Sequence, residues 1–343
     1  MKKILLVLTG GTICAFSGSD HTRGLDVARA KALLEENFRA SDSPFASVDA
    51  TQFAIGERFD TLSENMTFEV WNRVKTYLDA RPYEGFDGVV IAHGTDTLGY
   101  SAAMFAMLYA GVSVPMIFVA ADAPLDDERG NGNANFRAAV ECICRGITPG
   151  VYAVYRNSDG ATYLHAGSRL TQCAPYRADF YSEGMTALGG SVDLSATPIC
   201  NISRRGRDFS GKRLERRVLK LDPYVGTDYR AYDLSRFDAV LHGAYHSGTV
   251  CTSAADDGGS AVAFAERCAA EGKTLYISPA KSLGGEGGDV YESVLPLVGK
   301  ARFLWGMTAE AAYAKLTIAY SCFDDDEARR EYLAENTGGE YAY

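Results

Sequence analysis

Two short segments of the sequence place hydroxyl groups beside glycines, each directly after an apolar run. In "LLVLTGGTI", Thr9 and Thr12 flank a glycine pair, and in "VVIAHGTDTLGY", Thr95 and Asp96 follow a glycine. A threonine hydroxyl is a weak nucleophile that attacks once a base removes its proton. Glycine lets backbone N–H groups approach a ligand, and such donors stabilise a developing oxyanion. The two segments are therefore candidates for opposite walls of one reactive pocket.

Each segment also has an ordinary structural explanation. T-G-G-T is typical of a turn after a strand, and T-D-T before a helix is typical of an N-cap. Neither is a phosphate-binding loop, because the G-x-x-x-x-G-K-[ST] spacing is missing. The segment "GNGNAN" at Gly130 lacks the G-x-G-x-x-G pattern and a strand directly before it. A dinucleotide-dependent oxidoreductase remains only a fold-level alternative.

The segments around these loops alternate between strand and helix patterns. Continuous apolar runs predict strands over 3–8, 86–93, 114–121 and 150–155, and apolar residues at helical spacing predict helices over 26–38, 66–80, 98–111 and 133–146. Serial βαβ winding predicts an α/β fold with a doubly wound, mainly parallel sheet. Ligands of such sheets bind outside the carboxyl ends of the strands, where both threonine segments lie.

The length of 343 residues exceeds that of a usual single domain, so we expect two. A polar, irregular stretch over about 160–210 precedes a second α/β region, with strands expected over 237–245 and 273–280 and helices over 260–272 and 308–320. We place the boundary near Lys212, with a larger N-terminal domain over 1–211 and a smaller C-terminal α/β domain over 212–343. The tail "ENTGGEYAY" is expected to be frayed.

Composition restricts the partners of the chain. A formal net charge of −10 argues against nucleic acid, and the basic segment over 204–217 is interpreted as a solvated connector. The apolar run over 4–8 is too short for a signal peptide, and no window resembles a membrane span, so we predict a cytoplasmic protein without a membrane partner. Eight scattered cysteines indicate reduced thiols, and neither a metal nor a cofactor is expected.

The two threonine segments together resemble the paired motifs of the L-asparaginase and glutaminase family of amidohydrolases. "TGGTI" stands on the first strand, and "HGTDT" follows about 80 residues later. The stretches "VPMIFVAADAPLDDERGNGNANFRAA" and "SLGGEGGDVYES" extend the resemblance over most of the chain. Its cytoplasmic, type I branch is the most similar.

This resemblance implies hydrolysis of the side-chain amide of L-asparagine, or of a related small amide, to aspartate and ammonia. Thr12 would be the nucleophile, and Thr95 would be the second hydroxyl that faces the substrate. Asp96 matches the carboxylate that binds the substrate's α-amino group and shares a proton relay with Thr95. The family also implies a homodimer or homotetramer in which a neighbour's C-terminal domain closes each site.

Three further positions follow from the same resemblance. Ser63 would bind the substrate α-carboxylate, Glu64 would lie beside its ammonium group, and the backbone carbonyl of Ala121 would accept from the leaving amide. Ser63 and Glu64 also fit a helix-capping cluster before "MTFEVW", which is compatible with the binding role.

The sequence departs from the family at two positions. Gln172 stands where the family carries its relay lysine, and no lysine occurs between Lys75 and Lys212. Glutamine forms hydrogen bonds but cannot give or take a proton, so the relay is broken as written. The family's flap tyrosine is also missing, and His21 is the candidate substitute base in that segment.

These departures leave two hypotheses. In the first, the protein is an amidohydrolase with an altered relay, which the retained threonines and Asp96 favour. In the second, it is a non-catalytic or weakly active relative that binds a small amino acid.

Overall fold

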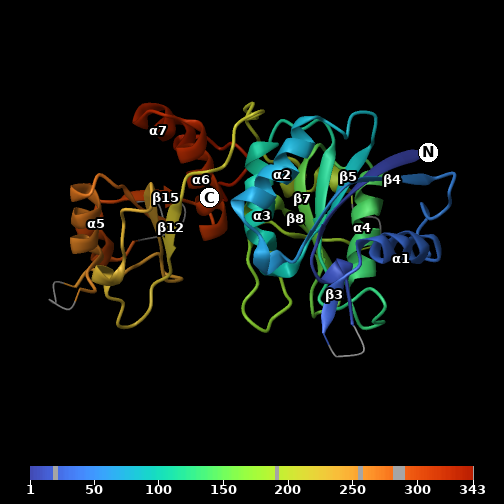
Figure 1. Ribbon diagram of the computed structural model, residues 1–343, viewed down its shortest axis with the longest axis horizontal. Helices are drawn as coiled ribbons and strands as arrows, with labels where there is room; N and C mark the ends of the chain where they lie inside the picture. The colour runs from blue at the N-terminus through green and yellow to red at the C-terminus, as the bar shows by residue number, and fades with distance from the viewer. Residues whose placement is uncertain (18–21, 190–192, 254–257, 281–289, 343) are drawn as a thin grey trace. The chain divides into compact units, whose positions relative to one another are not determined.

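The computed structural model describes residues 1–17, 22–189, 193–253, 258–280 and 290–342. They divide into two compact units (Figure 1). The first contains Met1–Gly211 together with Thr337–Gly339, and the second contains Lys212–Asn336 together with the residues from Glu340 onwards.

The first unit is built on a seven-stranded sheet. The strands follow the order β11 (Thr186–Ala187), β8 (Thr162–Ala166), β7 (Gly150–Arg156), β6 (Pro115–Val119), β5 (Gly88–Ala92), β1 (Lys2–Gly10) and β4 (Thr51–Thr61). The five strands from β7 to β4 are parallel, and β8 and β11 add antiparallel pairings at one edge. The prediction of a mainly parallel α/β sheet is thus confirmed.

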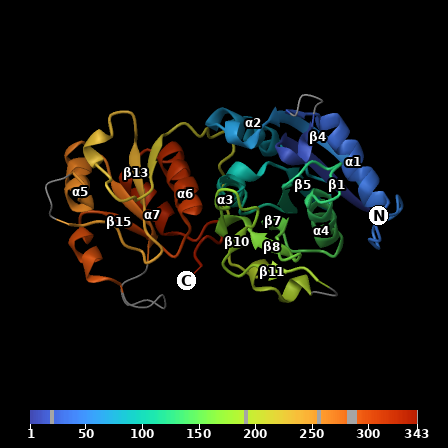
Figure 2. The same ribbon diagram turned by 90° about the horizontal axis from the view of Figure 1, so that it is seen from below.

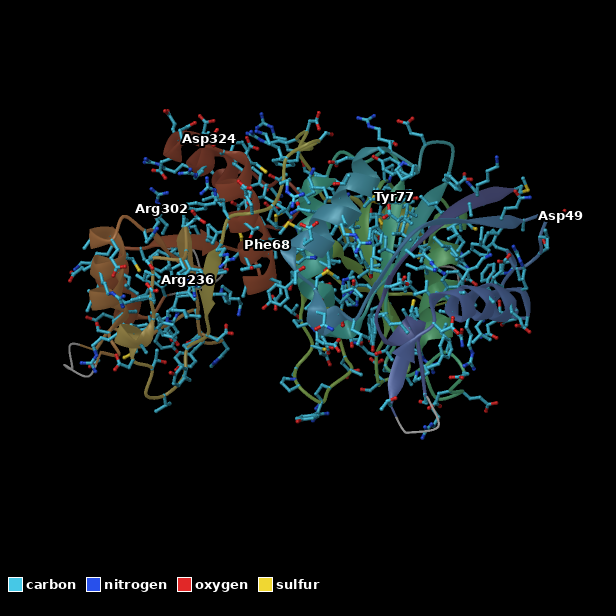
Figure 3. The ribbon with its side chains drawn as sticks, viewed as in Figure 1. Asp49, Phe68, Tyr77, Arg236, Arg302 and Asp324 are labelled. Atoms are coloured by element: carbon cyan, nitrogen blue, oxygen red, sulfur yellow. The ribbon has the colours of Figure 1, made fainter. Side chains whose placement is uncertain are left out.

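Helices cover both faces of this sheet (Figure 1). On one face lie α1 (Val27–Arg39) and α4 (Gly132–Cys144), and on the other lie α2 (Phe68–Asp79) and α3 (Leu98–Leu108). Two short antiparallel pairs, β2 (Ala15–Ser17) with β3 (Arg23–Leu25) and β9 (Leu170–Thr171) with β10 (Tyr181–Ser182), complete the strands. Tyr77 of α2, labelled in Figure 3, packs edge-to-face on Phe59 of β4 at 6.3 Å between ring centroids.

The strand order reverses at β1. The chain passes from β1 to β4 on one side, and then to β5 on the other side of β1. Crevices form at such switch points, outside the carboxyl ends of the strands. Leu8 of β1 is paired with Ala92 of β5, so the loops that follow these two strands leave the sheet at the same level.

The second unit holds a parallel four-stranded sheet in the order β12 (Val218–Leu221), β13 (Ala239–Gly243), β14 (Leu275–Ala280) and β15 (Arg302–Trp305). In Figures 1 and 2, α5 (Ala261–Ala270) lies on one side of this sheet and α6 (Ala309–Cys322) on the other, with α7 (Asp326–Ala334) against α6. The smaller α/β unit was predicted. Among the described residues, no helix combines the length and the apolar character that crossing a bilayer requires.

The expectation of a frayed C-terminal tail is wrong. Glu340 is only 1% exposed, and its side chain forms a buried ion pair with Lys315 of α6. In the first unit, Ser168 Oγ donates to the carbonyl of Gly338 at 2.8 Å, and Arg169 Nε donates to that of Gly339 at 2.7 Å. Polar tail residues are ordered here because buried partners satisfy them.

Candidate active site

The two predicted threonines begin matching turns at neighbouring strand ends. Thr12 opens the 3₁₀ turn η1 (Thr12–Cys14) after β1, and Thr95 opens η3 (Thr95–Thr97) after β5. Because β1 and β5 pair in parallel, both turns lie at the switch point of the sheet. The fold therefore brings together two segments that are far apart in the sequence.

Glycine is required for the contact between these turns. Gly11 has a φ of +78°, and a Cβ built on it would lie 2.2 Å from Gly94 Cα. A Cβ on Gly94 would in turn lie 2.3 Å from Ser63 Oγ. No side chain fits at either position without a shift, so the loops after β1 and β5 meet backbone against backbone, and the Ser63 side chain of the loop after β4 packs against Gly94.

The hydroxyls of this region divide into bonded and unbonded groups. Thr9 is buried, and its Oγ1 donates to the carbonyl of Ala92 at 2.8 Å, which fastens β1 to β5. Thr12 and Thr95 are both partly exposed, and within the described residues neither side-chain hydroxyl has a hydrogen-bond partner. Thr9 therefore has a structural role, whereas Thr12 and Thr95 have hydroxyls available for a ligand.

Ser63 joins its own turn to that of Thr95. Ser63 lies in the 3₁₀ turn η2 (Ser63–Asn65); its Oγ accepts from the backbone N–H of Asp96 at 3.2 Å and donates to Asp96 Oδ2 at 3.4 Å. Thr97 Oγ1 donates to the Ser63 carbonyl at 2.9 Å. Ser63 itself is 3% exposed, whereas Asp96 and Glu64 are exposed. The structure thus brings Ser63 and Asp96 together and leaves Glu64 on the rim of the same turn.

Two asparagines that the sequence reasoning missed position the loop of Ala121. Asn135 Nδ2 donates to the carbonyl of Ala120 at 2.9 Å, and its Oδ1 accepts from Arg156 N at 2.7 Å. Asn131 exchanges two hydrogen bonds with Asp122, at 2.9 and 3.0 Å. These side chains join the end of β6 to the end of β7 and so hold Ala121, which is fully buried. Their i, i+4 spacing in "NGNAN" was the available signal.

Replacing Asn135 with alanine is expected to lower the free energy of unfolding by about 2–3 kcal/mol, because one buried and one partly buried backbone group lose their partners. Urea unfolding measures this difference. Asn37→Ala is the matched control, since Asn37 bonds to one partly buried amide, Asn133, and we expect a loss of under about 1 kcal/mol. Equal losses in the two variants would contradict the assigned role of Asn135.

Gln172 lies directly beside Thr95. Its Nε2 donates to the Thr95 carbonyl at 2.6 Å, and its Oε1 accepts from Gly99 N at 3.1 Å. The Nε2 atom also lies 3.3 Å from Cys173 Sγ. The candidate base His21 lies outside the described residues.

Two buried histidines are held neutral. Burial lowers the pKa of His93 from 6.5 to about 4, and that of His165 to about 3. His93 Nδ1 lies 2.7 Å from the Gly94 carbonyl, which can only accept, so Nδ1 carries the hydrogen. A neutral His93 behind the Thr95 turn contributes shape rather than charge.

These histidines predict a loss of stability in acid. Both pKa values are lowered on folding, so the unfolded chain binds more protons below pH 6.5, and stability falls as the pH drops from 6.5 towards 4. Each histidine contributes a slope of about 1.4 kcal/mol per pH unit. Urea unfolding between pH 7 and 5 is expected to show a flatter pH dependence for His165→Asn than for the unmodified chain. An unchanged slope would contradict this origin.

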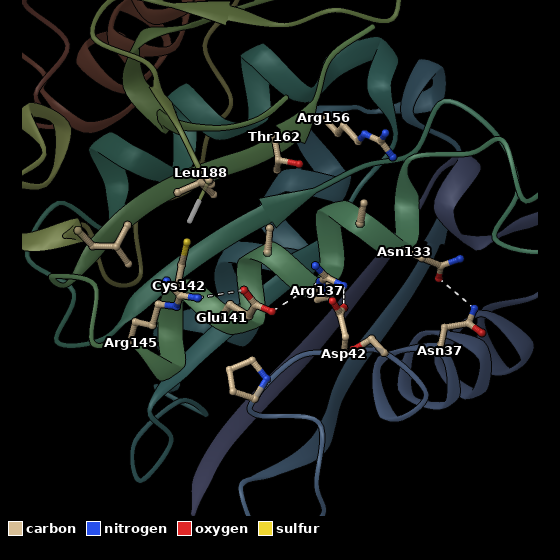
Figure 4. A pocket seen from close by; sticks show the side chains of 16 residues that line it. Asn37, Asp42, Asn133, Arg137, Glu141, Cys142, Arg145, Arg156, Thr162 and Leu188 are labelled. Carbon is tan, nitrogen blue, oxygen red and sulfur yellow. Dashed lines mark hydrogen bonds and ion pairs between the residues drawn. The ribbon is translucent and has the colours of Figure 1, made fainter. Parts of the chain in front are cut away.

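A cavity of about 590 Å³ lies between α1, α4 and the strand β8, away from the threonine turns (Figure 4). Arg137 pairs with Asp42 and lies 3.6 Å from Glu141, which also pairs with Arg145 at 3.6 Å. None of Thr12, Thr95 and Asp96 lines this cavity. Asp42 and Glu141 pair with two of its arginines, and the threonine turns are absent from its lining, so this cavity is not the site suggested by the sequence. Across the described part of the chain, no three His, Cys, Asp or Glu side chains gather to hold a metal ion.

Comparison with known proteins adds sequence and fold relatives. A glutamyl-tRNA(Gln) amidotransferase subunit from Aeropyrum pernix is 26% identical over 353 residues, covering 99% of this chain and 79% of that protein. The protein of the same name from Methanothermobacter thermautotrophicus is 27% identical over 362 residues, covering 99% of this chain and 77% of that protein.

Solved structures share the fold. The thermostable L-asparaginase from Thermococcus kodakarensis superposes with a TM-score of 0.75 at 19% identity, covering 98% of each chain. L-asparaginase I from Vibrio cholerae gives a TM-score of 0.75 at 22% identity, covering 99% of this chain and 98% of that one. The family model described as "Asparaginase, N-terminal" matches residues 3–197, the part of the chain that carries both threonine turns. The resemblance seen in the sequence is therefore confirmed, and the chain belongs to the asparaginase family.

Proposed function

We propose that this chain hydrolyses the side-chain amide of L-asparagine, or of a related small amino-acid amide, with Thr12 as the nucleophile. One observation carries the proposal. The hydroxyls of Thr12 and Thr95, both without a partner among the described residues, come from turns that the Gly11–Gly94 contact holds side by side.

In the proposed reaction, Thr12 Oγ1 attacks the amide carbon, and a C–O bond forms as the hydroxyl proton passes to a base. Backbone N–H groups of the glycine-containing turns stabilise the oxyanion. The C–N bond then breaks, ammonia leaves with one added proton, and water hydrolyses the resulting ester. Gln172 cannot be the base, whereas Asp96 is a carboxylate on the Thr95 turn.

The remaining predicted residues would orient the substrate. Asp96 and Glu64 are exposed carboxylates suited to an ammonium group, and the Ala121 carbonyl is an acceptor for the amide N–H. Ser63 is buried against Asp96, so we assign it the placement of that carboxylate in addition to any contact with the substrate's α-carboxylate. We further propose a homodimer or homotetramer in the cytoplasm, where the eight cysteines, none of which forms a disulfide, stay reduced.

The sequence relatives favour a second candidate function. Their name describes one component of an amidotransferase that acts on glutamyl-tRNA(Gln), and the similarity extends over 99% of this chain. In that case, the same turns would release ammonia for a partner protein. The third reading, a protein that binds a small amino acid without cleaving it, follows from the missing relay lysine.

One assay separates these readings. The purified full chain is mixed with L-asparagine, L-glutamine and their D-isomers, and ammonia release is measured against concentration. We expect saturable release from L-asparagine. A strong preference for L-glutamine would favour the amidotransferase role. Saturable binding of either amino acid by calorimetry without ammonia release would contradict catalysis.

A further inference from the structure

The first turn of α3 lacks its own cap. The first N–H groups of any helix have no partner within it, and a side chain at the N-cap usually accepts from one of them. Thr97 occupies the N-cap of α3 but makes no capping bond, because its hydroxyl donates to the Ser63 carbonyl. The buried N–H of Gly99 therefore depends on an acceptor from elsewhere.

Gln172 supplies that acceptor from 73 positions along the chain. Its Oε1 accepts from Gly99 N–H at 3.1 Å, while its Nε2 donates to the Thr95 carbonyl at 2.6 Å. Thr95 and Gly99 are four residues apart, the spacing of a helical hydrogen bond. The amide is inserted into this bond, and the Thr95 carbonyl accepts instead from Leu98 N, which keeps the turn 3₁₀.

Only an amide matches both groups. A carbonyl can only accept and a backbone N–H can only donate, so the amide has one workable orientation. A lysine ammonium carries donors alone, so it would leave Gly99 N–H without a partner and bring a positive charge to the positive end of α3. An ionised glutamate would satisfy Gly99 but face the Thr95 carbonyl without a donor.

We propose that Gln172 is a positioning residue that takes the place of a proton relay. Its amide fixes the Thr95 turn, and this turn carries Asp96, which is bonded to Ser63. The position that resembles the family's relay lysine thus holds a neutral clamp. The activity readouts rest on the proposed amidohydrolase function, whereas the structural readout does not.

Four variants of the full chain test the clamp. Gln172→Met removes both hydrogen bonds at similar volume, and we expect kcat to fall by about 10–100-fold, since small misplacements of reacting groups have effects of this size. For Gln172→Lys, we expect kcat to fall by the same factor. For Gln172→Glu, we expect kcat to be reduced at neutral pH and to rise relative to that of the unmodified chain as the pH falls. A protonated carboxyl again offers both a donor and an acceptor. Gln172→Asn, whose side chain is one methylene shorter, is expected to have a lower kcat than Gln172→Glu with its carboxyl protonated.

Two titratable groups among the described residues lie close to this clamp: Cys173, whose thiol pKa is raised by burial and which contacts the Gln172 amide, and Asp96 on the Thr95 turn. Because both groups are present in both proteins, the effect of their titration on kcat cancels when Gln172→Glu is compared with the unmodified chain at each pH. A rise of kcat in Gln172→Lys above the unmodified chain would assign a relay to this position and overturn the clamp.

Hydrogen exchange of the Gly99 amide is the readout independent of catalysis. We expect strong protection in the unmodified chain and at least about tenfold faster exchange in Gln172→Met, because the N–H loses its acceptor. Unchanged exchange in this variant would overturn the proposal. If no amide is cleaved but Gly99 protection depends on Gln172, the proposed function fails while the clamp stands.

Discussion

Exchange of Thr12 for valine is expected to lower kcat for amide hydrolysis by at least about 10³-fold, because the nucleophile is removed. The shape of the side chain is nearly kept. Since the Thr12 hydroxyl has no hydrogen-bond partner among the described residues, the free energy of unfolding should change by less than about 1 kcal/mol. Ammonia release and urea unfolding of the same preparation measure both effects.

Thr9→Val is the matched control from the same glycine-containing loop. Thr9 Oγ1 donates to the buried Ala92 carbonyl, so its loss should lower stability by about 1–2 kcal/mol while kcat stays within a few-fold. A Thr12→Val variant that keeps its rate would show that the nucleophile lies elsewhere. Thr95 would then be the next hydroxyl to replace.

Replacing Lys315 with methionine is expected to lower the free energy of unfolding by about 3–5 kcal/mol. Lys315 and Glu340 form an ion pair in which both side chains are fully buried, and the Lys315 ammonium also donates to the Glu335 carbonyl. Burial lowers the pKa of Lys315, and Glu340 opposes this shift. Without the lysine, an ionised Glu340 would remain buried after losing its ammonium partner. Denaturant unfolding of the two proteins provides the measurement.

Two further variants assign this effect to the buried charge. The double variant Lys315→Met with Glu340→Met removes both charges and should recover much of the loss, because apolar replacements of a buried pair are often tolerated. Lys300→Met breaks an exposed pair with Glu266 and should change stability by under about 1 kcal/mol. If the double variant is no more stable than Lys315→Met, an uncompensated Glu340 is not the cause.

Local sequence patterns predicted the elements that carry the site. The apolar runs of β1, β5, β6 and β7 and the periodic helices were visible because each reflects burial within a single segment. The strand β4 was missed. Its residues "TQFAIGERFDT" lie at the sheet edge and alternate poorly between buried and exposed, so pairing with β1 determines their conformation.

The candidate site was predictable only in part, for a related reason. The positions of Thr12 and Thr95 followed from motifs on two strands. The bonds of Gln172 to the Thr95 turn join residues more than 70 positions apart, and no local pattern encodes them. The contact of Gly11 with Gly94 also became visible only once β1 and β5 were paired.

The buried tail determines when the protein can finish folding during synthesis. In the first unit, Ser168 and Arg169 donate hydrogen bonds to backbone carbonyls 170 positions later in the chain. In the second unit, Lys315 of α6 forms its ion pair with Glu340. Neither unit completes its interior until residues 337–340 have left the ribosome. A nascent chain stalled before that point would hold a buried lysine without its carboxylate partner, and we expect it to be bound by chaperones rather than to be fully folded.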